Sequence, residues 1–468
     1  MRPPILSCWL LTILLILGNL PAAQASHIRG GDISYTSVAS TTAGVPRYHV
    51  VVRMFSEAMS VPPISSMPLR VSRAGCATAA PNSSTVQVPL IQSATSLPVT
   101  CANGSSLYYV ARYETDLDLP SGQWLLDVVN YARSAAIANI NNAASTDLYI
   151  SAFLDNTLTT QDASPKFESV LQPYLVLGTV PPHSFSAFDT DGDSLRYEAM
   201  LPLMACSTPA NSTYAPHYQV NTSSGAITQL ANSTTQGVYD IVVRVSEYRR
   251  INGAWQLLGS IMRDNLYLVY STANQAPTFT TLQVNGGASQ SLSQLIKASP
   301  GQTIALTLTA TDPDASQLLR FATEAINVVP GLTLTTLNAT QVKLTWQVPA
   351  TLPLGRYHIP VAVLDNGCPY SASEERTLSF LIVNQVLASR SAAPVVAPAY
   401  PTPFREQVQF AAPAGQAVII VDALGRVVAQ LASSADGQVR WQPAATLPAG
   451  VYLARGTEGQ PLARLLRE

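Results

Sequence analysis

Apolar and polar residues alternate with a period of two along much of the chain, in short runs rich in β-branched and aromatic residues. Alternation over about four to eight residues predicts strands with one buried face, and no segment beyond residue 25 keeps the 3.6-residue period of a long amphipathic helix. The clearest runs are 48–55, 106–113, 239–245, 265–270, 304–311, 341–348 and 357–364. The pattern therefore predicts an all-β fold.

Turn and linker signals divide these strands into blocks about one β-sandwich long. We expect an N-terminal β-sandwich at 26–172, an immunoglobulin-like or cadherin-like sandwich at 173–273 and a second immunoglobulin-like sandwich at 274–385. The stretch 386–399 is rich in Ala, Pro and Ser and has little to bury, so we interpret it as a linker. A small β-sandwich follows at 400–468.

A glycine two residues before an aromatic residue recurs at the start of four predicted strands. The pairs are Gly122 and Trp124, Gly237 and Tyr239, Gly355 and Tyr357, and Gly450 and Tyr452. In three of the four, Leu-Pro precedes the glycine. Any turn that leads into a strand can use such a pattern, but its spacing favours one occurrence per domain.

Residues 1–25 have the features of a cleavable secretory signal peptide. Arg2 precedes an apolar run at 5–20, and Ala23-Gln24-Ala25 forms an A-x-A cleavage site, so the mature chain should begin at Ser26. A membrane anchor is the alternative, but no charged stop signal follows at once. No later stretch reaches the ~18 consecutive apolar residues of a spanning helix. We expect an extracellular or outer-membrane cell-surface protein with no transmembrane segment after cleavage.

Charge is scarce in this chain. Charged residues make up 12% of the 468 residues, the formal net charge is −2, and only three lysines occur. No basic patch indicates a nucleic-acid partner. Polar uncharged residues cover the surface instead, as in many secreted β-proteins.

A series of motifs runs in order through the last block. The motif residues are Tyr400, Pro401, Pro403 and Phe404, then Leu424, Gly425 and Arg426, then Trp441, and last Gly450 and Tyr452. This series resembles the C-terminal sorting domain of proteins exported by the bacterial type IX secretion system. Thr402 replaces the usual Asn, and Arg464 and Arg467 stand in the last strand where Lys is common. The resemblance implies that residues 400–468 engage the type IX secretion machinery and that the protein is then attached to the cell surface.

The predicted mature N-terminus carries a second resemblance. The stretch 26–35, which reads Ser-His-Ile-Arg-Gly-Gly-Asp-Ile-Ser-Tyr, and the segment 133–140 resemble a family of surface proteins from gliding bacteria with cadherin-like or immunoglobulin-like sandwiches. That family usually carries a Cys pair just before the Arg, where this chain has Tyr131 and Ala132. The family's disulfide pattern therefore cannot be transferred. We interpret 133–140 as a loop.

Four cysteines remain after signal cleavage, and export makes their oxidation plausible. Cys76 and Cys101 lie in one predicted domain, so we predict a disulfide between them, worth roughly 3 kcal/mol in the chain-entropy model. Cys206 and Cys368 fall in different predicted domains, where each can be a small buried residue. No Cys-x-x-Cys occurs, which disfavours zinc.

An Asp-rich turn is the one candidate metal site. Asp189, Asp191 and Asp193 lie within five residues, and their mutual repulsion must be offset by backbone N–H groups, by water or by a hard cation. Calcium suits such oxygen ligands, although Asp and Gly also dominate ordinary turns. An EF-hand is excluded, because Met200 stands where its bidentate Glu belongs. Asp312 and Asp314 form a weaker copy, so both turns are candidate calcium sites.

We find no nucleophile elbow, phosphate-binding loop or metalloprotease motif in the sequence. The sequence therefore favours a non-catalytic, multi-domain surface protein with an adhesive or structural role, whose ligand is a surface, a glycan or a protein. The alternative is a secreted carbohydrate-binding or carbohydrate-active protein. An exposed row of aromatic residues beside paired carboxylates would favour that alternative, but we expect each tryptophan to be a core anchor.

Overall fold

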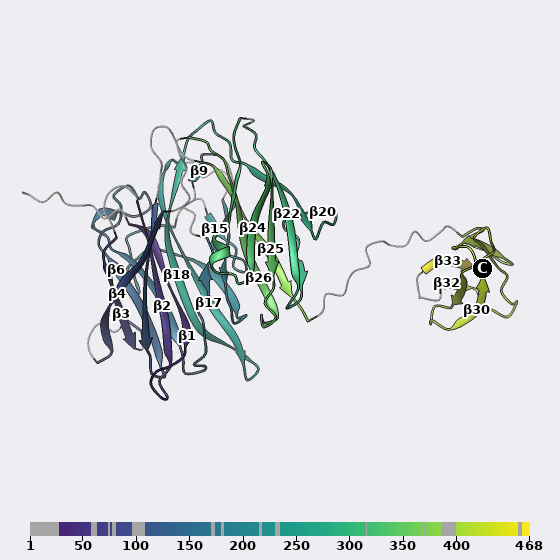
Figure 1. The fold of residues 1–468 in the computed structure, drawn as a ribbon, viewed down its shortest axis with the longest axis horizontal. Coiled ribbons are helices and arrows are strands. Elements are labelled where there is room, and N and C mark those ends of the chain that lie inside the picture. The colour runs from purple at the N-terminus through teal and green to yellow at the C-terminus, as the bar shows by residue number, and fades with distance from the viewer. Residues whose placement is uncertain are drawn as a thin grey trace, which may run out of the picture. The chain divides into compact units, whose positions relative to one another are not determined.

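The computed structural model describes residues 28–468 except for 58–62, 74, 77–80, 96–107, 170–173, 179–181, 215–217, 230–234, 315, 369–370, 385–398 and 457–460 (Figure 1). The predicted signal peptide, Cys101 and nearly all of the expected linker lie outside the described residues. The described part contains 33 strands and two short 3-10 helices, η1 (Ala143–Ser145) and η2 (Glu324–Asn327). The all-β prediction is confirmed.

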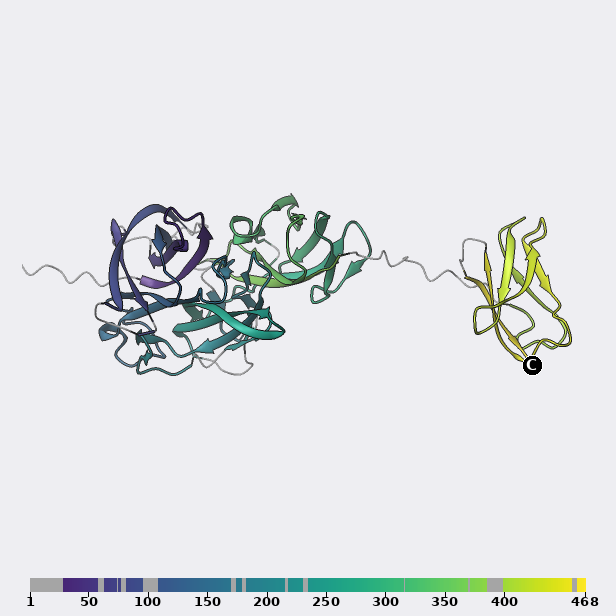
Figure 2. The same cartoon turned by 90° about the horizontal axis from the view of Figure 1, so that it is seen from below.

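Eight strands of the first part of the chain hydrogen-bond in an unbroken circuit. In circuit order they are β1 (Ile28–Val38), β2 (Arg47–Glu57), β5 (Tyr108–Asp118), β4 (Ser83–Thr95), β3 (Ser66–Arg73), β6 (Gln123–Asn130), β7 (Leu148–Asp155) and β18 (Ala254–Tyr270). The circuit closes where Gly30, Gly31 and Asp32 of β1 pair with Asn265, Asp264 and Arg263 of β18. In Figure 2 the purple and blue strands curve around a shared interior.

Further strands extend this sheet and cover its core. Strand β17 (Gly237–Ile251) pairs with β18, and β12 (Ser194–Met200) pairs with β17. Strand β9 (Tyr174–Val176) also pairs with β18. Small sheets are formed by β8 (Lys166–Phe167) with β11 (Ala187–Phe188), by β10 (His183–Ser184), β16 (Ala226–Gln229) and β15 (Tyr218–Val220), and by β13 (Leu203–Ala205) with β14 (Thr208–Pro209).

Residues on both sides of position 173 share one hydrophobic core. Tyr197, Ile227 and Tyr239 pack in the same cluster as Tyr35 and Tyr48. The boundary that we predict at 173 therefore does not separate two cores. The reason is the long β17–β18 hairpin, because its second strand closes the N-terminal circuit.

Two buried ion networks lie at this closure and explain the N-terminal motif residues. Asp32 accepts hydrogen bonds from Arg53 Nε at 2.8 Å and from Arg263 Nε at 2.8 Å. Arg133 donates to Asp264 at 2.7 Å and also pairs with Asp240. Segment 133–140 has no helix, as expected. These motif residues thus join β1 and the 133–140 loop to β17 and β18.

Residues 278–382 form a β-sandwich with its own core. One sheet runs β20 (Ser289–Gln290), β19 (Thr278–Val284), β22 (Thr303–Thr311), β25 (Gln341–Gln347) and β24 (Leu332–Asn338). The other runs β21 (Ile296–Ala298), β27 (Ser373–Ile382), β26 (Gly355–Leu364) and β23 (Arg320–Ala322). Strands β19, β22, β25 and β24 follow the ABED order of an immunoglobulin constant-type domain and β23, β26 and β27 follow its CFG order, with β20 and β21 added at the edges. The predicted immunoglobulin-like fold is confirmed here.

The chain divides into two units at Val386 and Leu387, where we place the start of the linker. The C-terminal unit contains a pair of strands, β28 (Val408–Ala411) and β31 (Gln438–Trp441), and a four-stranded sheet. That sheet runs β30 (Val427–Ala432), β29 (Ala417–Val421), β32 (Gly450–Gly456) and β33 (Pro461–Arg467). The core of this unit contains Phe404, Trp441 and Tyr452. The ring centroid of Trp441 lies 5.7 Å from that of Phe404 and 5.3 Å from that of Tyr452.

The recurring Gly-x-aromatic pattern has one structural explanation at all four positions. Each aromatic side chain donates a hydrogen bond to the backbone carbonyl four residues earlier. The bonds are Trp124 Nε1 to Pro120 (2.8 Å), Tyr239 Oη to Thr235 (3.1 Å), Tyr357 Oη to Pro353 (2.9 Å) and Tyr452 Oη to Pro448 (2.6 Å). The three tyrosines therefore form tyrosine corners, which fix the chain as it turns into a strand.

Candidate functional site

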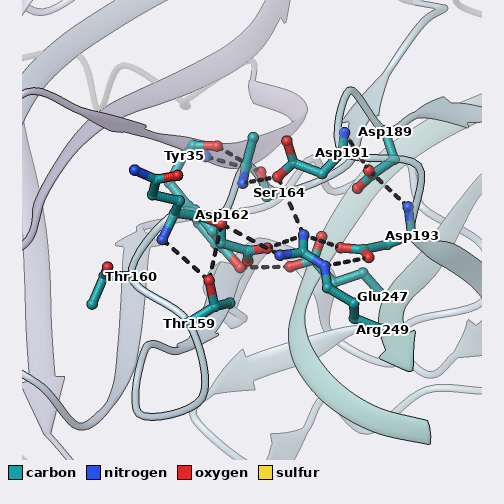
Figure 3. Close-up of polar contacts among 12 residues, drawn as sticks. Tyr35, Thr159, Thr160, Asp162, Ser164, Asp189, Asp191, Asp193, Glu247 and Arg249 are labelled. Atoms are coloured by element: carbon teal, nitrogen blue, oxygen red, sulfur yellow. Dashed lines mark hydrogen bonds and ion pairs between the residues drawn. The ribbon is translucent and has the colours of Figure 1, made fainter. Parts of the chain in front are cut away.

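Five carboxyl groups and one guanidinium meet between the loop before β8, the turn before β12 and the end of β17 (Figure 3). They belong to Asp162, Asp189, Asp191, Asp193, Glu247 and Arg249. One carboxylate oxygen each from Asp189, Asp193 and Glu247 lies within 4.8 Å of the other two. The same holds for Asp162, Asp191 and Asp193. The three predicted aspartates are thus brought together, and two further acids and an arginine join them.

Backbone N–H groups order the turn that carries the predicted aspartates. Asp189 Oδ1 accepts hydrogen bonds from the N–H groups of Asp191 (2.9 Å) and Asp193 (3.1 Å). Gly192 has a φ of +77°, and a Cβ atom there would lie 2.5 Å from the Cβ of Pro353. Only glycine suits this position, so the local sequence determines the turn. The turn chemistry predicted from Asp and Gly is therefore present, whether or not a cation binds.

Arg249 is the internal counter-charge of the cluster. Its Nε and a terminal nitrogen donate to the two oxygens of Asp193, each at 2.7 Å. The same terminal nitrogen lies 2.8 Å from Asp162 Oδ1 and 3.3 Å from Asp191 Oδ2. These contacts, first of all the hydrogen bond to Asp193, raise the pKa of Arg249. One positive charge thus faces five carboxyl groups.

Glu247 extends the core-facing row of β17 into the cluster. Val243 and Val245 point into the core, and the period of two puts Glu247 and Arg249 on the same face. Glu247 is fully buried, and its Oε1 accepts a hydrogen bond from the Tyr35 hydroxyl at 2.7 Å. The sequence holds one signal for this role, a charged residue at an inward position of an apolar strand.

The protonation of these acids depends on their burial. Burial raises the pKa of Asp162 to about 6, that of Asp189 to about 7 and that of Glu247 well above its usual value. Within the described residues, Asp162 Oδ2, Asp189 Oδ2 and Glu247 Oε2 are buried and accept no hydrogen bond. Protons or a hard cation can satisfy these oxygens, and an all-oxygen donor set fits calcium.

Two cavities flank the cluster, and Asp191 and Arg249 line both. The larger has a volume of about 1000 Å³ and is bordered by the 37–47 segment. The smaller, of about 530 Å³, lies under Trp255, whose side chain is 62% exposed. The expectation that every tryptophan is a core anchor is wrong for Trp255. It holds for Trp346 and Trp441, which are buried.

The second Asp-rich turn brings fewer acids together. Asp312 Oδ1 accepts a hydrogen bond from the Asp314 N–H at 2.7 Å, and Asp314 Oδ2 accepts one from the Gln275 N–H at 2.8 Å. Among the residues that the structure describes, these two aspartates belong to no group of three acids close enough to hold one ion. The geometry here is that of a hydrogen-bonded turn, and calcium at this position stays a prediction.

The predicted disulfide between Cys76 and Cys101 is wrong. Cys76 is bonded to Cys206, with Cα atoms 5.7 Å apart, and Cys368 is disulfide-bonded as well. Our pairing assumed that Cys76 and Cys206 lie in different domains. Because the circuit of strands unites residues 28–270, the loop after β3 and the β13–β14 turn become neighbours, which sequence distance does not show.

The sorting-motif residues of the C-terminal unit divide into buried and exposed groups. Phe404 and Tyr452 are core residues, and the Phe404 N–H donates to the Leu466 carbonyl at 2.8 Å. Arg426 pairs with Asp422 at 2.7 Å in a turn where Gly425 has a φ of +81°. The side chains exposed to solvent include Tyr400 and Leu424. Pro401 and Pro403 flank Thr402 in the segment that leads to Phe404.

No family model matches this chain, and no curated protein matches it. Among solved structures, the chain is similar to human protocadherin-24 EC1-2, with 14% identity over 48% of this chain and 100% of that chain and a TM-score of 0.17. It is also similar to the eight N-terminal immunoglobulin domains of Down syndrome cell adhesion molecule, with 11% identity over 94% of this chain and 49% of that chain and a TM-score of 0.17. A chimeric titin Z1Z2 tandem matches with 14% identity over 47% of this chain and 99% of that chain, at a TM-score of 0.16. Such low scores give no information about function.

Proposed function

We propose that the protein is a secreted, non-catalytic surface protein with an adhesive or structural role, exported by type IX secretion through residues 400–468. In this proposal the signal peptide directs the chain to the periplasm and the C-terminal unit engages the secretion machinery. The upstream β-sandwiches then act outside the cell. In the described part of the chain, no helix has the length and apolarity needed to cross a membrane.

The separate C-terminal unit is the observation that carries the proposal. It has its own hydrophobic core, and the motif residues Phe404, Trp441 and Tyr452 build that core. A module that is recognised during export and then removed must fold without help from its passenger. A separate core supports that requirement.

Deletion of residues 400–468 tests the export route. The truncated chain should stay folded in the periplasm, whereas the full chain should reach the surface with an N-terminus at Ser26. Fusion of residues 387–468 to a periplasmic reporter is the control, and it should carry the reporter across the outer membrane. Surface delivery of the truncated chain at the normal level would contradict the sorting assignment.

We propose further that the acidic cluster holds a calcium ion. Asp189, Asp193 and Glu247 would hold it, and Asp162 and Asp191 would lie beside it with Arg249. The ion would supply the positive charge that the buried oxygens lack. It would also tie the turn before β12 to the end of β17, so its role would be structural.

The carbohydrate-binding alternative is favoured by one observation. Trp255 presents its indole to solvent next to a cavity that Asp191 and Asp193 also line. The pattern that we named as favouring a sugar ligand is an exposed row of aromatic residues beside paired carboxylates, and Trp255 with these aspartates supplies one aromatic residue of such a row.

A further inference from the structure

We propose that the cavity of about 530 Å³ under Trp255 binds an acidic glycan. The turn before β12 forms one side of this cavity, the β17–β18 hairpin another, and the beginning of β26 a third. The inference rests on the proposed adhesive function, for which it names the class of ligand and the place where the ligand binds.

The β17–β18 hairpin presents Trp255 to the cavity. Asn252 and Gly253 have φ values of 51° and 84°, as a tight two-residue hairpin turn requires, so the two strands stay paired up to their ends. Trp255 lies opposite Arg250 in the register of this hairpin. An indole that is 62% exposed contributes little to folding, but its flat apolar face can pack on the C–H face of a sugar ring.

Acidic and basic residues both line the cavity. Asp189 and Asp193 are buried and Asp191 pairs with Arg249, so the exposed charges left to attract a ligand are positive. Arg249 is engaged by the acidic cluster, so it offers little to a ligand. Arg250 and Arg356, both exposed, line the same cavity, and neither forms an ion pair with any residue that the structure describes. Within the described part of the chain, the side chain of Arg250 donates only to the Gly253 carbonyl, at 3.2 Å. Two such guanidinium groups suit the carboxylate or sulfate groups of a glycan, which they can bind through paired hydrogen bonds.

His358 adds no positive charge to this site at neutral pH. Burial and then the neighbouring Arg356 lower its pKa to about 4, and its Nδ1 lies 3.1 Å from the Ser379 hydroxyl. The attraction for an anion therefore comes from Arg250 and Arg356. Trp255 supplies the apolar contact, which an acidic peptide would use less well than a sugar ring.

Titration of the exported protein with oligogalacturonate tests the inference, with a maltooligosaccharide of equal length as the neutral comparison. Oligogalacturonate should bind and should protect Trp255 fluorescence from acrylamide quenching. Trp255→Ala and Arg356→Ala should each weaken binding about tenfold or more, because each removes a direct contact. Arg196→Ala is the matched control. Arg196 is exposed on β12 and does not line this cavity, so the control should bind within about twofold of the original chain, as remote surface changes do.

Three outcomes would overturn the inference. The first is that oligogalacturonate fails to bind. The second is that the maltooligosaccharide binds equally well and independently of Arg356. The third is that a poly-glutamate peptide competes with oligogalacturonate equally well in the original chain and in Trp255→Ala. Surface delivery is measured on the same variants. Normal delivery without glycan binding would contradict this inference alone, whereas failed delivery of the original chain would contradict the proposed export.

Discussion

The hydroxyl of Tyr35 on β1 donates a hydrogen bond to Glu247 on β17 at 2.7 Å, although the two residues are 212 positions apart. Tyr35 belongs to the large hydrophobic core of residues 28–270, and Glu247 is fully buried. The bond leaves Glu247 Oε2 buried and without a partner among the described residues, and one oxygen of Glu247 lies within 4.8 Å of an oxygen of Asp189 and of Asp193. The first strand of the fold thus holds in place an acid of the candidate cation site.

Calcium should stabilise the unit formed by residues 28–386. At a calcium concentration ten times the dissociation constant, binding contributes about 1.4 kcal/mol, which should raise Tm by a few degrees over the value in EDTA. Glu247→Gln and Asp189→Asn should abolish the rise, because each removes a buried carboxylate that would bind the ion. Asp314→Asn is the control and should keep it. An unchanged Tm in calcium would mean that the turn needs no ion.

In the absence of calcium, protons should bind to the buried acids of the cluster, and the pH dependence of the free energy of unfolding should show this. Asp162 and Asp189 have folded pKa values of about 6 and about 7, above their unfolded value near 3.9. The folded chain therefore binds more protons than the unfolded chain in this range. In EDTA, the contribution of these acids to stability is complete below pH 4 and is lost as the pH rises toward 7.

Urea unfolding at pH 5 and pH 7.5 in EDTA measures this slope. Glu375 also has a pKa raised to about 7 by burial, so the contribution of the cluster is the difference between the original chain and Asp189→Asn. The variant should lose less stability between the two pH values. Equal losses would assign the slope to other groups. With calcium present the original slope should flatten, because the ion displaces the protons.

Local signals predicted much of the fold and part of the site. Strands β22 and β26 match the runs 304–311 and 357–364, because alternation is a property of the strand itself. The aspartate turn was found for the same reason. Glu247 was missed because its partner Tyr35 is brought near only by the closure of the strand circuit. The boundary at 173 was wrong for that reason too, since no local pattern shows that β18 pairs with β1.

The disulfide between Cys76 and Cys206 should be a large contribution to stability. It closes a sequence separation of 130 residues, for which the chain-entropy model gives about 5 kcal/mol. Non-reducing peptide mapping should recover the Cys76–Cys206 pair, and Cys76→Ala with Cys206→Ala should lower the free energy of unfolding by several kcal/mol. Recovery of a Cys76–Cys101 peptide would contradict the structure. A double variant as stable as the original would show that the cross-link contributes nothing.

The tyrosine corners give a test of whether the two units fold independently. Tyr452→Phe removes the hydrogen bond to the Pro448 carbonyl and should destabilise the C-terminal unit by about 1 kcal/mol. Tyr357→Phe removes the equivalent bond to Pro353 and should destabilise the unit formed by residues 28–386 by a similar amount. Because the two units have separate hydrophobic cores, each substitution should lower the midpoint of one unfolding transition only. Hydrogen exchange read by peptide assigns each change to its unit, and each variant is the matched control for the other. If either substitution lowered the protection of both units equally, the chain would unfold as one cooperative body. That result would contradict the proposal that the C-terminal unit folds without the rest of the chain.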